Sequence, residues 1–135
     1  MNISNIGRCG IRVLIDLAEQ FGQAPVSLAS IGERTKISIR RLEKAAVILR
    51  RAAYIKSVKG ASGGYILSKP PGEINIGEVL RVLEGDMLVA DPPLPFSRET
   101  MFRSHIRAVV FSSLNERIAR VINSYTLATL IMGRK

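Results

Sequence analysis

The stretch from residue 38 to residue 65, SIRRLEKAAVILRRAAYIKSVKGASGGY, decides how this chain folds. Its first half repeats apolar residues at helical spacing, and Ser38 stands where a helix N-cap belongs. Residues 54–59 then alternate apolar and polar side chains, which is typical of a half-buried strand. A second short strand is predicted at residues 65–68, directly after a glycine-rich turn. We therefore expect a capped helix followed by an antiparallel β-hairpin.

An overlapping stretch, residues 34–59, concentrates the positive charge of the chain. Residues 34–59 contain nine Lys or Arg residues against one acidic residue, Glu43, and so carry +8 of the formal net charge of +9. Charge concentrated in this way indicates a polyanionic partner. The 135 residues are 47% hydrophobic and 23% charged, which is ordinary for one globular domain and argues against disorder. No stretch resembles a signal peptide or a membrane span, so a cytoplasmic protein is expected.

The segments on either side of this stretch are predicted to be helices. Apolar residues recur at helical spacing from residue 8 to residue 21, where Gly22 ends the pattern, and residues 2–6 form either a first helical turn or a small strand. Ser27 is expected to cap a short helix, and Asn75 a further helix that Gly85 stops. Three helices followed by a hairpin indicate a winged helix-turn-helix. The expected fold is mainly α with a small β-hairpin, and residues 1–85 form a DNA-binding domain.

The carboxyl-terminal part is expected to mediate dimerisation. Residues 86–103 are predicted to form a linker or sensor-region loop, because residues 91–97 contain three prolines. Residues 104–135 are predicted to form one long helix, through about residue 130, and a tail. Seven apolar residues are expected to line its dimer-forming face: Ile106, Val110, Leu114, Ile118, Val121, Ile122 and Tyr125. A helix tethered in this way has little of its own domain to pack on, so we expect it to pair with a second copy.

A set of polar, basic and glycine residues is predicted to contact double-stranded DNA. They are Ser27, Ser38, Arg40, Arg41, Glu43, Lys44, Arg50, Arg51, Lys56, Lys59, Ser62, Gly63 and Tyr65. On the recognition helix, Arg40 or Arg41 can donate to O6 and N7 of guanine. Glu43 either accepts from cytosine N4 or forms a salt bridge with Arg40 or with a neighbouring chain. Arg50 and Arg51, at the far end of the helix, are expected to contact phosphates.

The hairpin is expected to act as a wing. Glycines at positions 60, 63 and 64 allow its backbone to approach a minor groove closely. Lys56 and Lys59 would bring positive charge to the phosphates or to the groove floor. The alternative is a tight hairpin with two solvated lysines.

Several short motifs spread over nearly the whole chain match a known pattern. They include Gly7-Arg8-x-Gly10, Pro25-Val26-Ser27-Leu28, Ile37-Ser38, Leu42-Glu43, Gly63-Gly64-Tyr65, Lys69-Pro70-Pro71 and Leu83-Glu84-Gly85. With these motifs the chain resembles the Rrf-two family of bacterial winged-helix regulators, the group of IscR, NsrR and CymR. The resemblance implies a homodimer, paired through the long carboxyl-terminal helix, that binds a palindromic operator. It also implies repression as the commonest output.

The chain departs from this family where a cofactor would bind. Iron–sulfur members carry three cysteines before the long helix, and the matching positions here are Pro93, Glu99 and His105. A conventional cluster is therefore not expected, since thiolates supply its ligands, and no other cofactor is expected. The alternative is a redox or metal sensor of the same family that uses Glu99 and His105, or Cys9, as ligands. The resemblance leaves a small-molecule effector or a docked metabolic enzyme as the source of the signal.

Cys9 allows two interpretations. It is either an ordinary buried residue or a redox-responsive thiol whose thiolate Arg8 and Arg12 would favour. A winged-helix protein that binds RNA or the ribosome would share the basic helix, although the wing and the dimer helix favour DNA. An enzyme is not expected, because the sequence has one His, at position 105, and no evident nucleophile–base pair.

Overall fold

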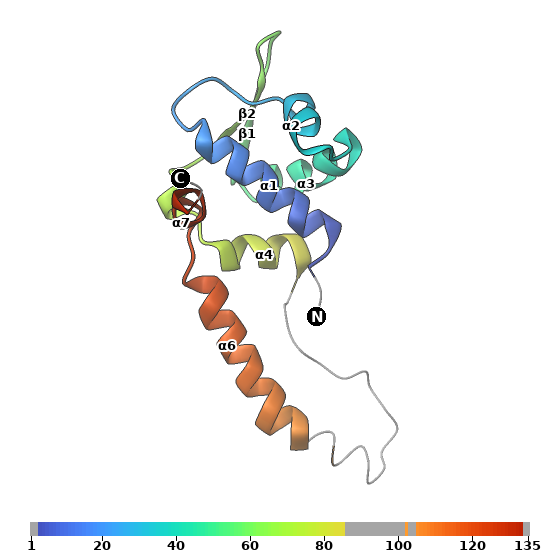
Figure 1. Cartoon of the computed structure of the whole chain (residues 1–135), viewed down its shortest axis with the longest axis vertical. Coiled ribbons are helices and arrows are strands. Elements are labelled where there is room, and N and C mark those ends of the chain that lie inside the picture. The colour runs from blue at the N-terminus through green and yellow to red at the C-terminus, as the bar shows by residue number, and fades with distance from the viewer. Residues whose placement is uncertain (1–2, 86–101, 103–104, 134–135) are drawn as a thin grey trace.

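The computed structural model describes residues 3–85, 102 and 105–133. In chain order the elements are α1 (Asn5–Glu19), α2 (Leu28–Thr35), α3 (Ile39–Arg51), β1 (Ile55–Val58), β2 (Gly64–Leu67), the 3-10 turn η1 (Pro71–Glu73), α4 (Ile76–Glu84), the π-helical turn η2 (Arg107–Phe111), α6 (Ser112–Asn123) and α7 (Leu127–Met132). The mainly helical winged helix-turn-helix expected from the sequence is confirmed (Figure 1). Within the described ranges, no helix combines the length and apolarity that a membrane crossing requires.

Side-chain caps start the helices at the expected positions. The side chains of Ser27, Ser38 and Asn75 each accept a hydrogen bond from the backbone N–H three residues later. Such caps satisfy a donor that the first helical turn would otherwise leave unpaired. Ser4 caps α1 in the same way, so the residues before position 8 form a helical turn rather than a strand. Gly85 ends α4 with a positive φ of 79°, as expected of a glycine stop.

The wing is pinned to the segment that precedes α2. β1 and β2 pair antiparallel, with Ile55 opposite Leu67. Val26 and Tyr65 exchange two backbone hydrogen bonds, of 3.0 and 2.8 Å, which form an isolated antiparallel β-bridge. A Cβ atom on Gly64 would overlap the backbone of Val26, so this glycine is required by packing within the chain. Gly60, in the turn of the hairpin, is favoured by its backbone conformation rather than by packing, because its φ of 118° is one that other residues rarely adopt.

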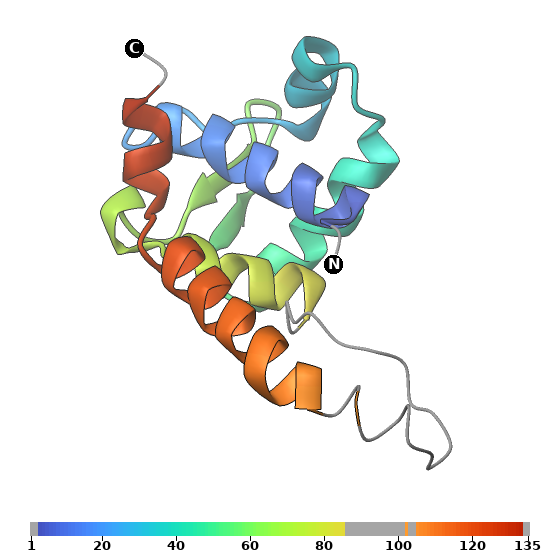
Figure 2. The same ribbon diagram turned by 60° about the horizontal axis from the view of Figure 1, so that its bottom comes forward.

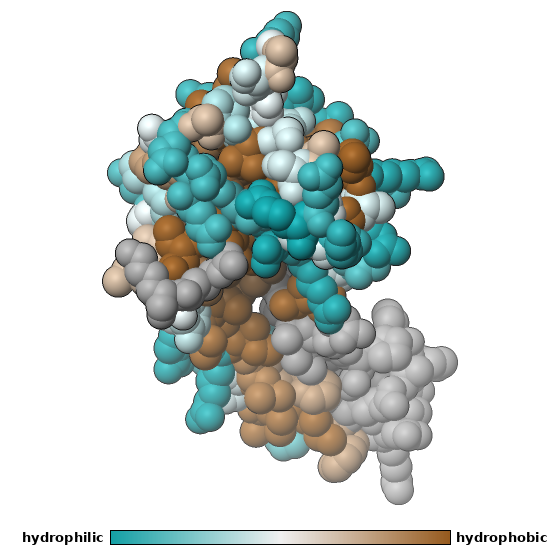
Figure 3. All heavy atoms as spheres, turned by 45° about the horizontal axis from the view of Figure 1, so that its top comes forward, coloured by the Kyte–Doolittle hydropathy of each residue, from teal (hydrophilic) through white to brown (hydrophobic). Residues whose placement is uncertain are grey.

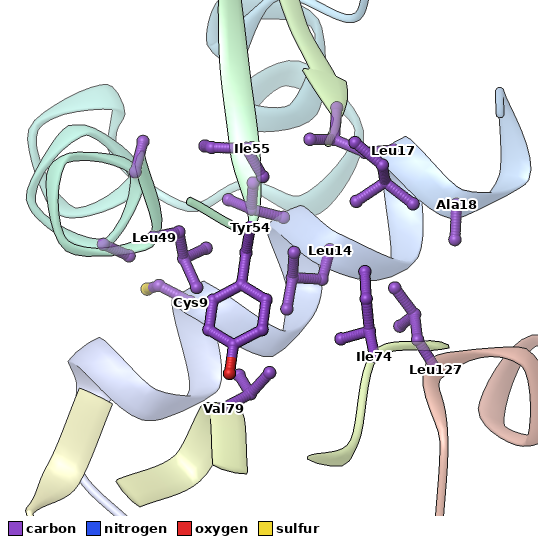
Figure 4. Packing of buried hydrophobic residues seen from close by; sticks show 14 of the residues in the cluster. Cys9, Leu14, Leu17, Ala18, Leu49, Tyr54, Ile55, Ile74, Val79 and Leu127 are labelled. Atoms are coloured by element: carbon purple, nitrogen blue, oxygen red, sulfur yellow. The ribbon is translucent and has the colours of Figure 1, made fainter. Parts of the chain in front are cut away.

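The core lies where α1 crosses α3 and α4. Its fully buried side chains include Leu14 from α1, Leu49 from α3 and Val79 from α4. Leu127, from the other end of the chain, is equally buried, and Figure 4 shows it beside Ile74 in the same cluster. The amino-terminal domain therefore includes a contribution from α7 in its core.

The prediction of one helix from residue 104 to about residue 130 is wrong. The helix ends at Asn123, and the chain then runs beside the segment before α4. There the N–H of Ile76 donates to the carbonyl of Tyr125, and the N–H of Leu127 donates to the carbonyl of Ile74. Thr126 then caps α7, which packs against α1. Backbone pairing between distant segments, together with a new N-cap, breaks the helix at this point.

Asn123 fastens the end of α6 to α4. Its carbonyl accepts from the side chain of Asn75 at 2.7 Å, and its side-chain oxygen accepts from Arg81 at 2.7 Å. Gly77 lies directly beneath it, because a Cβ atom there would meet the Asn123 side chain. From this attachment α6 extends away from the wing end of the molecule (Figures 1 and 2).

Replacing Leu127 by Ala should destabilise the whole domain, not only its last helix. The side chain is fully buried, and truncation of such a leucine costs about 2–5 kcal/mol. Met132→Ala, on the exposed side of α7, is the matched control and should have little effect. Urea unfolding at one fixed protein concentration measures both. An unchanged unfolding midpoint for Leu127→Ala would show that α7 is not part of the cooperative unit.

Candidate DNA-binding surface

The amino-terminal half of α3 forms an exposed basic surface. Leu42 and Ala45 face the core, whereas Arg40, Arg41 and Lys44 are exposed. The turn before α3 is tight, because Lys36 adopts the left-handed conformation with a φ of 61°. The first turns of α3 therefore present guanidinium and ammonium groups at the positive end of a helix dipole.

Glu43 is also exposed, and it forms no ion pair with Arg40 in the part of the chain that the structure describes. Within the described residues the carboxylate is therefore not paired with Arg40, and a salt bridge to a neighbouring chain stays a prediction. The carboxylate remains available to an external donor such as a cytosine amino group.

The other predicted contacts lie on three different elements. Arg50 and Arg51 are exposed in the last turn of α3, and Lys56 and Lys59 are exposed on the wing strand and beyond it. Ser62 is exposed at the tip of the hairpin. Ser27 and Gly63 are half-buried, and so is Tyr65, which packs against the core. Tyr65 therefore has a structural role beside any contact with DNA.

A groove of about 480 Å³ joins α2 to the wing. It brings together three predicted contact residues, Ser27, Ser62 and Gly63, that are far apart in sequence. Figure 3 shows that hydrophilic side chains prevail over the wing end of the molecule, whereas apolar side chains gather toward α6. The polar end and the apolar end of the molecule are thus separate.

Arg34 and Asp16 are functional candidates that the sequence reasoning missed. Asp16 lies on α1 and is only 2% exposed. Its carboxylate lies 3.4 Å from Nε of Arg12 and 3.8 Å from Nη1 of Arg34 on α2. One sequence signal was available, because Asp16 interrupts the apolar stripe of α1 four residues after Arg12.

The candidate metal ligands are Glu99, His105 and Cys9. Glu99 lies outside the described residues, and His105 is exposed. Cys9 is 4% exposed and sits in the core on the side of Leu49 (Figure 4). Among the residues that the structure describes, no group of three His, Cys, Asp or Glu side chains could hold a metal ion.

The environment of Cys9 opposes the reactive-thiol interpretation. Burial raises the pKa of the Cys9 thiol above its ordinary value, and the positive charge of Arg41 offsets this only in part. The sequence had suggested Arg8 and Arg12 as the stabilising cations, but the opposing charge that acts on the thiol comes from α3. A thiol with a raised pKa carries little thiolate at neutral pH, so Cys9 is expected to be inert.

Residues 3–133 match the protein family Rrf2, described as "Iron-dependent Transcriptional regulator". This chain belongs to the Rrf2 family. It is 38% identical over 129 residues to the HTH-type transcriptional regulator CymR of Bacillus subtilis, covering 93% of this chain and 92% of that protein. It is 31% identical over 133 residues to the HTH-type transcriptional regulator IscR of Serratia proteamaculans, covering 97% of this chain and 79% of that protein.

Solved structures agree with this assignment. The structure of CymR, the global cysteine regulator of B. subtilis, superposes with a TM-score of 0.79 at 33% identity, covering 98% of this chain and 97% of that one. T. potens IscR superposes with a TM-score of 0.76 at 36% identity, covering 100% of this chain and 89% of that one. The chain is therefore a DNA-binding transcriptional regulator with the winged-helix fold of its family.

The iron in the family description is not matched by the residues of this chain. An iron–sulfur cluster draws its ligands mainly from several thiolates. The sequence has a single cysteine, and that residue is buried in the core. The donor set present does not fit a conventional iron–sulfur cluster.

Cys9 should react slowly with thiol reagents while the protein is folded. Its pKa is raised by burial, so the reactive thiolate is depleted at neutral pH, and the sulfur is shielded as well. Absorbance at 412 nm after addition of Ellman's reagent measures the rate, with the urea-denatured chain as control. Rapid labelling of the folded protein would show that the sulfur is accessible and that the redox interpretation must be reopened.

Proposed function

We propose that two copies of this chain form a homodimer that represses transcription from a palindromic operator. The observation that carries the proposal is the exposed basic start of α3, capped by Ser38, beside a wing that is fixed to the body of the domain. In a winged helix-turn-helix such a helix enters the major groove, and each subunit reads one half-site. Because its partner is DNA, we place the protein in the cytoplasm of a bacterial cell.

The exposed apolar face of α6 and of the turns before it supports pairing of two copies. Val109 and Val121 are 58% and 57% exposed, and Val110, Leu114 and Tyr125 are also exposed. A contiguous apolar face of this kind is unusual on a monomer and marks an interaction surface. Ile122 is half-buried against its own core, so it would add less to a dimer than the other members of the predicted stripe.

The division of roles among the charged residues follows from their place in the fold. Arg40 and Arg41 lie in the first turn of α3 and are positioned to reach base edges. Arg50 and Arg51 lie in its last turn, and Lys59 beside the wing turn, where phosphates are the expected partners. Between the first and the last turn of α3, Glu43 adds a carboxylate that can accept a hydrogen bond from a base, and Lys44 adds a further positive charge.

We further propose that the protein acts without a conventional iron–sulfur cluster. Its single, buried cysteine supports this, since such a cluster needs several accessible thiolates. The signal would then come from a small-molecule effector or from a metabolic enzyme that docks on the regulator.

Replacing Arg40 or Arg41 by Ala should weaken operator binding and relax specificity at one base pair. Loss of a bidentate contact to guanine costs about 1–3 kcal/mol. The operator is first selected from random duplexes with the wild-type protein, and fluorescence anisotropy then gives each affinity. Arg120→Ala removes the same charge from α6 and should bind normally. Equal losses on selected and random duplexes would make the residue a phosphate contact instead.

Replacing Leu114 by Glu should convert the dimer into a monomer. The substitution places a charge on the exposed apolar face, in the first turn of α6, where a partner copy would have to desolvate it. Ser113→Glu adds the same charge at the neighbouring exposed position and serves as the control. Sedimentation velocity measures the oligomeric state. A Leu114→Glu variant that stays dimeric would mean that the pairing surface lies elsewhere.

A further inference from the structure

The groove between α2 and the wing contains three of the predicted DNA contacts, and it also contains Arg34, which that prediction does not include. It has a volume of about 480 Å³ and lies between Ser27, Ser30 and Arg34 on one side and residues 61–63 of the wing on the other. These elements are adjacent because Val26 pairs with Tyr65 just before α2 begins. The shape of the groove is therefore set by backbone hydrogen bonds.

Arg34 is held on one side and open on the other. Its Nε donates to the carbonyl of Ser30 at 3.3 Å, and its Nη1 lies 3.8 Å from the carboxylate of Asp16. The side chain is nevertheless 49% exposed. Nη2 has no hydrogen-bond partner among the described residues, and a guanidinium can donate five hydrogen bonds in one plane. The Arg34 side chain thus lines the groove with N–H donors that are not used within the described residues.

The charges around Asp16 do not cancel. The buried carboxylate lies between two guanidinium groups, those of Arg12 and Arg34, so the cluster keeps one net positive charge. Burial of Asp16 is costly unless it is paired, and breaking such a pair would leave its charge uncompensated. The carboxylate therefore restrains Arg34 on the side away from solvent, and the pairing does not neutralise the cluster as a whole.

Hydroxyl groups supply further donors. Ser27 Oγ accepts from the N–H of Ser30 at 3.1 Å, but its own hydrogen has no acceptor among the described residues. Ser62 is exposed on the facing side of the groove. A fixed guanidinium together with two hydroxyl groups suits an oxyanion with several acceptor atoms, and a phosphate diester of DNA has this chemistry.

We propose that this groove holds one backbone phosphate of the operator in each half-site, with Arg34 as its cationic ligand and Asp16 as the residue that positions Arg34. The proposal rests on the proposed function, because α3 and the wing must contact the same duplex for one of its phosphates to enter the groove between α2 and the wing. The contact fixes the register of the protein on DNA and carries no base preference of its own.

A set of operator duplexes, each with one neutral methylphosphonate in place of a phosphate, tests the proposal. Wild-type protein should lose about tenfold in affinity when the phosphate in the groove is replaced, which corresponds to about 1.4 kcal/mol. Arg34→Met removes this contact from both half-sites, so it should lose about a hundredfold on unmodified DNA. It should lose no further affinity when the phosphate at that one position is replaced. Because one phosphate contact per subunit is removed, the salt dependence of log K should fall by roughly two for the dimer.

The control is Arg120→Met, which removes one positive charge from α6, at the other end of the molecule. It should keep the wild-type pattern at every methylphosphonate position. An Arg34→Met variant that keeps this full pattern and the wild-type salt slope would overturn the proposal. If Arg41→Ala still weakens operator binding in that case, the proposed function stands without the groove. A wild-type protein that prefers no duplex would overturn both.

Asp16→Asn tests the positioning role separately. It should weaken operator binding in the wild-type background, but it should have no further effect in an Arg34→Met background, since Asp16 acts through Arg34. Circular dichroism confirms that the variants are folded. Equal additional losses in both backgrounds would overturn the positioning role of Asp16. If Asp16→Asn does not fold, Asp16→Glu, which keeps the charge but shifts it, replaces it in the same comparison.

Discussion

The backbone pairing between residues 74–76 and residues 125–127 is the constraint on which the rest of the structure depends. Two hydrogen bonds, from Ile76 to Tyr125 and from Leu127 to Ile74, join segments about fifty residues apart in sequence. They stop α6, start α7 and bring Leu127 into the core. The apolar helix that would pair with a second copy is thereby attached directly to the domain that carries α3.

The attachment continues through α4 to the recognition helix by a series of close contacts. Asn123 is bound by Asn75, the N-cap of α4, and by Arg81 in its last turn. At its far end, Glu84 accepts two hydrogen bonds of 2.8 Å from Ser4, the residue that caps α1. Gly10 allows Leu83 to approach α1 closely. Since α1 packs extensively on α3, the direction of α6 and the position of α3 are linked through rigid elements.

The parts of the fold that depend on local chemistry could be predicted from the sequence. Ser27, Ser38 and Asn75 cap helices because a short polar side chain can reach a backbone N–H three residues on, whatever surrounds it. The hairpin follows from alternation and glycines in the same way. The break at Asn123 could not be predicted, because the competing hydrogen bonds come from a segment before α4. The nearest local signal was Thr126, a possible N-cap inside an otherwise continuous apolar pattern.

In the candidate site, too, features set by local sequence could be predicted, whereas those set by contacts between distant segments could not. Exposure of Arg40, Arg41 and Lys44 follows from helical periodicity, since the buried positions of α3 are apolar. The partnership of Asp16 with Arg34 joins two helices, and no spacing rule within either helix indicates it. The summed charge of +8 over residues 34–59 therefore hides a difference between the basic residues that contribute to it. One of its members, Arg34, is tied to a buried carboxylate, while those on α3 are free of such ties among the described residues. A restrained cation such as Arg34 suits a contact of fixed geometry with the DNA backbone, whereas the unrestrained cations of α3 can adapt to base edges. Under the proposals above, α2 therefore positions the protein on the DNA backbone and α3 reads the bases.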